Sequence, residues 1–346
     1  MMTNAEIAAA LEELGTLYER DGADRYRVRA YRTAARAIRD CPDSVAGLAE
    51  AGRAKEIPGI GKTLEQKILA LLETGDIPSA AKLRGKQPAA AEELATFLAE
   101  HPGEGLVDLP DIRGDLHAHT TLSDGRNTLE EMAEAARARG YAYLAITDHS
   151  ASHGFGDNVT AERLWGRIEE IRAWNEGKRG FRLLAGSEVN IGTDGSLDYP
   201  EDLLAELDWA IASVHTSFSI SEERMTARIV AAIENPHVDC IGHLTGRLIG
   251  RREPYAVDIE AVVEAAARTG TMLEINGNPS RRDLCEEHAR LAADAGVKIV
   301  LDTDAHGIET LDNMSYAVIV ARGAGLTPDQ VANTRSWRDF SRLIKG

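Results

Sequence analysis

The sequence predicts a two-part protein in which a small all-helical domain precedes a closed α/β barrel of seven parallel strands. Its 346 residues exceed what one compact domain usually contains, so two domains are expected. Apolar residues recur at helical spacing up to about residue 85. From Arg113 onward, apolar runs alternate with helical stretches about every 30 residues, which is the length of one strand and helix unit.

The first domain, residues 1–85, is expected to consist of helices. In the segment 4–20, apolar residues recur close to every 3.6 positions, at Ile7, Leu11, Leu14 and Leu17. The helical pattern continues over 31–39 and stops at Pro42. Two further helices are expected over 45–51 and 63–73, with the turn 57–61 between them.

A linker is expected over residues 86–111, which are rich in Ala, Pro, Gly and Glu. One amphipathic helix, around 92–100, is expected within it. The second domain then runs over residues 112–346. Its predicted strands are 114–117, 143–147, 182–186, 209–214, 239–242, 272–275 and 298–301. No Gly-x-Gly-x-x-Gly motif follows a strand, so a closed barrel is favoured over a dinucleotide-binding sheet.

Charge divides the chain into two different parts. The net charge is −17, yet residues 1–87 carry 14 Lys and Arg against 13 Asp and Glu. The acidity therefore belongs to the barrel. Within the first domain, the segment 25–39 holds six arginines and no acidic residue, which predicts a local basic face suited to a phosphate-bearing partner.

Composition favours a cytoplasmic protein outside the membrane. No uncharged apolar run approaches the roughly 18 residues of a membrane helix, and the first ten residues lack the pattern of a signal peptide. The three cysteines are far apart, which argues against both a disulfide framework and a zinc-binding cysteine motif.

Potential metal ligands gather where the predicted strands end. In parallel barrels the chemistry collects at the carboxyl ends of the strands, and six of the seven ends here deliver a His, Asp or Glu. Alternate residues of a strand point to the same side, so His117 and His119 are expected to share a cavity. A single such histidine is more often a hydrogen-bonded loop residue, but six together with carboxylates indicate bound Zn, Mn or Fe.

Residues 113–346 resemble the PHP (polymerase and histidinol phosphatase) family, specifically the PHP domain of bacterial family X DNA polymerases. The resemblance is carried by GDLHAHTTLSDG at 114–125, ITDHS at 146–150, GSE at 186–188, SVHTS at 213–217, GHLTGR at 242–247, EIN at 274–276 and TDAH at 303–306. It implies a distorted seven-stranded, TIM-like barrel, which agrees with the strand count above.

The resemblance also implies two or three divalent ions, Mn²⁺, Zn²⁺ or Fe²⁺, that promote phosphoester hydrolysis by generating hydroxide at neutral pH. One ion is assigned to His117, His119, Glu188 and Asp304, a second to Glu188, His215 and His243, and a third to Asp124, His149 and His306. Glu188 is thus expected to bridge two ions. Arg247 and Arg281 are expected to clamp phosphate, with an ordinary surface salt bridge as the alternative for each. Asp148 is expected to orient a neighbouring imidazole, and His153 to lie at the rim.

The first domain resembles the helix-hairpin-helix domain that opens family X polymerases, including DNA polymerase beta. The resemblance is carried by YRVRAYRTAARAI at 26–38 and IPGIGKTLEQKI at 57–68. Glycines at such a turn expose backbone N–H groups that can hold a DNA phosphate, although a purely structural turn is the alternative. The expected DNA-binding residues are Arg27, Arg29, Arg32, Gly59, Gly61, Lys62 and Lys67. Lys67 matches a lysine that forms a Schiff base in animal members, and a solvated helix lysine is the alternative.

Together, these features predict a metal-dependent phosphoesterase acting on DNA ends, as a 3′-5′ exonuclease, a 3′-phosphatase or an abasic-site endonuclease. The expected partner is DNA at ends, gaps or abasic sites, bound through residues 1–84; no protein partner is inferred. The polymerase palm has no counterpart in the roughly 27 residues between the domains, so no DNA synthesis is expected. A phosphatase for small metabolites and a non-catalytic DNA-end-binding module remain the alternatives.

Overall fold

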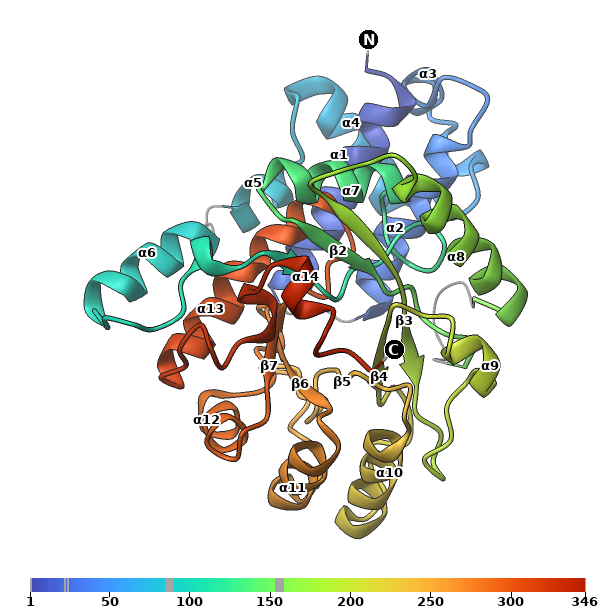
Figure 1. Cartoon of the computed structure of the whole chain (residues 1–346). Coiled ribbons are helices and arrows are strands. Elements are labelled where there is room, and N and C mark those ends of the chain that lie inside the picture. The colour runs from blue at the N-terminus through green and yellow to red at the C-terminus, as the bar shows by residue number, and fades with distance from the viewer. Residues whose placement is uncertain (1, 22, 24, 85–89, 153–158, 346) are drawn as a thin grey trace. The chain divides into compact units, whose positions relative to one another are not determined.

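A computed structural model describes residues 2–21, 23, 25–84, 90–152 and 159–345. Within it the chain divides into two compact units, residues 1–89 and 90–346. The first is entirely helical and the second is an α/β barrel, as the sequence predicts (Figure 1).

The first unit is built around two long helices, α1 and α2, which pack against each other. Their buried apolar faces include Leu11 and Leu14 of α1 and Ile38 of α2, all fully excluded from solvent. The helices are α1 (Asn4–Arg20), α2 (Arg25–Arg39), α3 (Val45–Glu50), α4 (Lys62–Thr74) and α5 (Pro78–Arg84), with a 3₁₀ turn at Ala54–Glu56. The expected helix over 31–39 thus begins earlier, at Arg25.

The second unit contains seven parallel strands that follow one another in chain order around a barrel. They are β1 (Gly114–Asp115), β2 (Tyr143–Ile146), β3 (Arg182–Asn190), β4 (Trp209–Ser213), β5 (Cys240–Ile241), β6 (Met272–Asn276) and β7 (Ile299–Asp302). Beyond the first and last strands, Ala118 and Ala305 form a parallel bridge, in which His119 N donates to Ala305 O at 2.8 Å. This bridge brings the two edges together, so the prediction of a seven-stranded barrel is confirmed.

Helices lie outside the strands and cover their apolar outer faces, as α10, α11 and α12 do in Figure 1. They are α6 (Ala90–Glu100), α7 (Leu129–Ala138), α8 (Ala161–Asn175), α9 (Glu201–Leu204), α10 (Glu222–Glu234), α11 (Ile259–Thr269), α12 (Glu286–Asp294), α13 (Met314–Gly323) and α14 (Trp337–Phe340), with 3₁₀ turns at Leu109–Asp111, Ile308–Asn313 and Ala332–Thr334. Over the described ranges of both units, no helix combines the length and apolarity needed to cross a lipid bilayer.

Aromatic side chains close the amino end of the barrel. Tyr143 at the start of β2, Trp209 at the start of β4 and Phe340 of α14 are fully buried. The ring centroids of Tyr143 and Phe340 lie 5.2 Å apart, and those of Trp209 and Phe340 lie 5.6 Å apart. Because this end is packed with apolar side chains, the polar interior is confined to the carboxyl ends of the strands.

The expected linker over 86–111 is wrong for residues 90–111, which belong to the second unit. Helix α6 packs against α13, and Leu94 of α6 is 5% exposed. Val107 N donates to Leu326 O at 2.9 Å, and the Arg322 guanidinium donates back to Val107 O at 3.1 Å. Helix α6 packs on the barrel through Leu94, Phe97 and Leu98, whereas Ala95 and Ala99 are exposed.

Candidate metal centre

All nine predicted ligands lie at the carboxyl end of the barrel, in β3 or on the loops that follow the other strands. His117 and His119 follow β1, Glu188 lies within β3, and Asp304 follows β7. Seven of the nine residues are from 0% to 8% exposed, whereas the side chains of Asp124 and His306, at the rim, are 20% and 18% exposed. His243 and Asp304 have positive φ angles of 27° and 52°, a conformation that non-glycine residues rarely adopt. Such backbone strain is typical of functional sites.

Gly125 allows the loop after β1 to fold back against the site. A Cβ atom at this position would lie 2.6 Å from the backbone carbonyl carbon of His119. Only glycine therefore permits the close approach that brings Asp124 beside His119. The glycine of the sequence motif at 114–125 thus has a steric role.

Glu188 lies at the centre of the cluster. One carboxylate oxygen, Oε1, lies 2.9 Å from His243 Nε2 and 3.1 Å from His215 Nε2. The other oxygen, Oε2, lies 2.8 Å from His149 Nδ1 and 3.4 Å from His117 Nε2. Its two oxygens therefore face two different groups of imidazoles, which is the arrangement that a bridging carboxylate needs.

The remaining carboxylates form two further groups with the histidines. Asp304 Oδ1 lies 3.2 Å from His119 Nε2 and 3.6 Å from His117 Nε2. Asp124 Oδ2 lies 3.2 Å from His306 Nε2, while Asp124 Oδ1 lies 3.7 Å from His149 Nε2. His119 and His149 each direct one ring nitrogen to one group and the second nitrogen to another, so the three groups share side chains.

The donor atoms fit divalent cations. Ligands about 2.0–2.3 Å from one ion in tetrahedral geometry lie roughly 3.3–3.7 Å from each other, and several of the separations above fall in or near this range. His117 Nε2 and His119 Nδ1 are buried and make no hydrogen bond. Buried polar atoms without a hydrogen bond are costly, and a cation would supply the missing partner. Three groups of His, Asp and Glu around this mouth could each hold an ion, namely His119, Asp124, His149 and His306; His117, His119 and Asp304; and His149, Glu188 and His215.

Electrostatics keeps the carboxylates ionised. Burial by itself would raise the pKa of Glu188, but the imidazoles of His215, His149 and His117 outweigh it and hold the pKa well below its usual range. Burial lowers the pKa of His119 to about 4, with a further contribution from the charges of His306 and His149. The ionised carboxylate is the protonation state of Glu188 that a metal ion requires, and the neutral imidazole is the one that it requires of His119.

A carboxylate from β6 supports the ligands from outside the cluster. Glu274 Oε1 lies 2.6 Å from His117 Nδ1, and its other oxygen accepts a hydrogen bond from the backbone N–H of His243. Asn276 donates at 3.2 Å to both Glu274 and Asp304. A fourth group of potential ligands, His117, Glu274 and Asp302, lies deeper in the barrel.

Sequence reasoning gave Glu274 and Asp302 no role, although the signal was present. Each stands two residues before another inward-pointing polar residue, Asn276 or Asp304, and alternate strand residues share a face.

Asp148 was predicted to orient an imidazole, and the structure shows different partners for its carboxylate. Asp148 accepts hydrogen bonds at 2.7 Å from Thr120 N, Thr120 Oγ1 and Ser123 Oγ, so it holds the loop that carries Asp124 rather than an imidazole.

The two predicted phosphate-binding arginines have different environments. Arg281 Nε lies 3.4 Å from Asp304 Oδ2, so this guanidinium borders the cluster. Arg247 donates from Nε to Arg281 O at 2.7 Å and from its terminal nitrogen to Arg282 O. Arg247 is therefore engaged by the backbone of the loop that presents Arg281. His153 lies outside the described residues.

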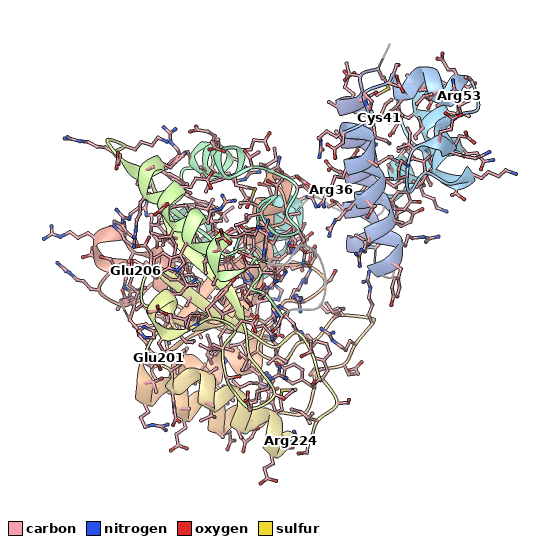
Figure 2. The ribbon with its side chains drawn as sticks, turned by 90° about the vertical axis from the view of Figure 1, so that its right-hand side faces the viewer. Arg36, Cys41, Arg53, Glu201, Glu206 and Arg224 are labelled. Carbon is pink, nitrogen blue, oxygen red and sulfur yellow. The ribbon has the colours of Figure 1, made fainter. Side chains whose placement is uncertain are left out.

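The predicted DNA-binding residues of the first unit lie on α2 and around the start of α4. Arg27 and Arg29 are exposed, whereas Arg32 is half-buried because α2 packs that side toward α1. Figure 2 labels Arg36 on the same helix, which is also exposed. Gly59, with a φ of 83°, and Gly61, the N-cap of α4, form the exposed turn before Lys62. Lys67 is half-buried, and its Nζ donates to Ser79 Oγ at 2.6 Å.

Comparisons with known proteins agree with this division. A family model for a helix-hairpin-helix domain matches residues 2–77, and one for a PHP domain matches residues 115–278. The DNA polymerase/3′-5′ exonuclease PolX of Bacillus subtilis (strain 168) is 47% identical over 240 residues. That match covers 69% of this chain and 42% of the relative, so the chain spans less than half of that protein.

Other relatives match this chain over nearly their whole length. A probable phosphatase of Thermoanaerobacter sp. (strain X514) is 38% identical over 232 residues, which covers 64% of this chain and 89% of that protein. The crystal structure of a histidinol phosphate phosphatase from Lactococcus lactis, complexed with Zn, L-histidinol and phosphate, aligns with a TM-score of 0.46 and 18% identity over 62% of this chain and 94% of that one. The sequence matches to the barrel and to the helical domain establish that this chain belongs to the PHP domain family and carries its barrel behind a helix-hairpin-helix domain.

Proposed function

We propose that this PHP-family enzyme, a metal-dependent phosphoesterase, acts on the ends of DNA strands. The observation that carries the hydrolytic part is the position of Glu188, whose two oxygens face two groups of buried histidines. The cation-binding residues would be His117, His119, Asp124, His149, Glu188, His215, His243, Asp304 and His306. When bound, the ions would polarise the phosphoester and supply a nucleophile at neutral pH.

The protein side chains would divide the remaining work. The guanidinium of Arg281, 3.4 Å from Asp304, can donate two hydrogen bonds to the oxygens of a phosphate held beside the cluster. Arg247 would position that guanidinium by binding the carbonyls of Arg281 and Arg282. Asp148 and Glu274 would hold Asp124 and His117 in place through the hydrogen bonds described above.

The DNA part of the proposal is supported by the helical domain. Exposed arginines of α2 and the glycine turn before α4 offer charge and backbone N–H groups to a phosphate backbone without reading bases. A phosphatase acting on a small metabolite has no need of such a domain. The 47% identity to a protein named as a polymerase and 3′-5′ exonuclease supports the same substrate class.

A small phosphoester is the second candidate substrate. It is favoured by the relatives named as probable phosphatases, one of which is covered over 89% of its length by a match to 64% of this chain. The same ion-binding residues would serve either substrate.

End-labelled DNA distinguishes the candidates. The full chain with Mn²⁺ should be incubated with duplexes that carry a 3′-hydroxyl, a 3′-phosphate or an abasic site, and in parallel with a chromogenic phosphate ester. Shortening or dephosphorylation of the DNA, lost in His117→Ala, is expected. Hydrolysis of the ester without any change in the DNA would show that the substrate is a small phosphoester and not a DNA end.

A further inference from the structure

Two loops at the mouth of the barrel are basic in an otherwise acidic unit. The loop after β5 carries Arg247, Arg251 and Arg252, and the loop after β6 carries Arg281 and Arg282. The acidic residues of these loops lie outside the arginine-bearing stretches, Glu253 and Asp258 after the first and Asp283 after the second, and Arg282 pairs with Glu93 at 2.5 Å. Because the net negative charge of the chain lies in this unit, the arginines of these two adjacent loops form a local cationic patch within it.

The loop after β5 forms a short hairpin that is attached to the second loop. Leu248 and Arg252 form an antiparallel bridge, and Arg252 Nε donates to Gly246 O at 2.8 Å. Ile249 N donates to Ser280 O at 2.7 Å. At the base, Thr245 N donates to Asp283 Oδ2 at 3.0 Å. The hairpin is therefore held in a fixed position beside the turn that presents Arg281 to Asp304.

The tip of this hairpin combines an apolar side chain with a charged one. Ile249 is 51% exposed, Gly250 adopts a φ of 74°, and Arg251 is exposed. Close to the base of the hairpin, the Arg252 guanidinium lies 4.0 Å from the centroid of the Phe218 ring. An exposed isoleucine alone needs no explanation, but here it stands between cationic side chains beside the candidate catalytic centre.

We propose that the hairpin Leu248–Arg252 grips the nucleic-acid strand that leads to the scissile phosphate, with Arg251 on a backbone phosphate and Ile249 against the face of a base. This inference rests on the proposed DNA function and adds a strand-binding element within the barrel itself. A strand presents alternating anionic phosphates and apolar base faces, which match the alternation of arginine and isoleucine at the tip. Apolar side chains of this kind also pack against or between bases in known complexes.

The position of the hairpin tip distinguishes an oligonucleotide from a small phosphoester as the bound ligand. The tip is the three-residue turn 249–251 beyond the Leu248–Arg252 bridge, in which Arg251 N donates to Leu248 O at 2.8 Å. A single phosphate group bound beside Arg281 leaves the tip without a ligand, whereas an oligonucleotide continues past it. Changes at the tip should therefore alter the affinity for an oligonucleotide more than the KM for a small ester.

The test is a competition experiment on the full chain with Mn²⁺. A tetrathymidylate with phosphorothioate linkages serves as a competitive inhibitor of chromogenic ester hydrolysis, and the ratio of its inhibition constant to the KM of the ester is measured. Arg251→Ala and Ile249→Ser should each raise this ratio about fivefold or more, as expected for the loss of one charged or stacking contact. In Arg251→Ala, the slope of the logarithm of affinity against the logarithm of salt should fall by about 0.7.

Arg224→Ala is the matched control, because Arg224 is an exposed arginine on α10 (Figure 2). Its ratio should equal that of the wild type. Equal ratios in all three variants would overturn the role of the hairpin, while cleavage of labelled DNA by the wild type would keep the proposed function. A third outcome is possible, in which the oligonucleotide inhibits the wild type and the tip variants bind it more weakly, but labelled DNA stays intact. That result would support the role of the hairpin and contradict the proposed reaction on DNA ends. Absence of inhibition in the wild type would overturn the hairpin inference.

Discussion

Glu274 Oε1 lies 2.6 Å from His117 Nδ1, and both side chains are fully buried in the barrel. This contact fixes the imidazole so that Nε2 faces Glu188 and Asp304. The second oxygen of Glu274 accepts from the His243 backbone. One carboxylate on β6 therefore orients a ring that follows β1 and a loop that follows β5.

Replacement of Glu274 by Gln should weaken metal binding about 10- to 100-fold, because a carboxylate beneath a ligating histidine sets its tautomer and strengthens it as a ligand. Titration with Mn²⁺, followed through both ion content and ester hydrolysis, measures the change. Glu264→Gln on α11, an exposed glutamate, is the control. A Glu274→Gln protein with wild-type metal affinity would show that the contact has only a packing role.

Glu188→Ala should cause the largest loss of hydrolysis among the nine proposed ligands. Its two oxygens face separate histidine groups, so its removal disturbs two ions, and we expect a decrease of about 100-fold or more. Elemental analysis should find two or three transition-metal ions per wild-type chain and fewer in the variant. One ion or none in the supplemented wild type would contradict the proposed centre.

Arg27→Ala together with Arg29→Ala should weaken binding of duplex DNA and flatten its salt dependence. Both side chains are exposed on α2, and each lost phosphate contact should lower the slope by about 0.9 on duplex DNA. Arg32 is left unchanged because it is half-buried. Equilibrium titrations at several salt concentrations measure the slope.

The control for this pair is Arg53→Ala, since Arg53 is an exposed arginine of the same unit and pairs with Glu56 (Figure 2). Its removal should leave the slope near the wild-type value. Identical slopes in the double variant and the wild type would place the DNA-binding surface elsewhere on the chain.

The titration of Asp239 should make the barrel more stable at mildly acidic pH than at neutral pH. Burial raises the pKa of Asp239 to about 6 from an ordinary value of 3.8, so the folded protein binds the proton more tightly than the unfolded chain. This contribution is fully present below pH 4 and is lost as the pH rises through 6, amounting to about 3 kcal/mol. Asp239→Asn removes the titration, so its melting temperature should fall less than that of the wild type between pH 4.5 and 7.5.

The comparison is made between the two proteins at each pH, so that titration of the metal centre cancels. Asp239 accepts hydrogen bonds from Ala210 N at 2.9 Å and Lys345 N at 2.7 Å, and the asparagine oxygen can replace only one of them. A constant offset between the proteins is therefore expected in addition to the change in slope. Parallel curves would show that Asp239 does not titrate in this range.

The sequence by itself determined the positions of the strands and the identities of the metal-binding candidates. Each of the seven predicted strands overlaps an observed strand, because short apolar runs and the turns between them are local features of the chain. The convergence of the nine ligand candidates also followed from local information, since parallel strands deliver their carboxyl ends to one mouth. The family resemblance supplied the grouping of these residues into ion sites.

Only the tertiary structure decided which side chains meet across the barrel. His119 and His149 each face two groups, Glu274 contacts a histidine 157 positions away, and Arg247 binds backbone carbonyls while Arg281 borders the cluster. Likewise, α6 packs on the barrel although its composition predicts a linker. These relationships depend on strand register, barrel closure and side-chain rotamers, which are fixed by packing between distant segments and leave no periodic signal in the sequence.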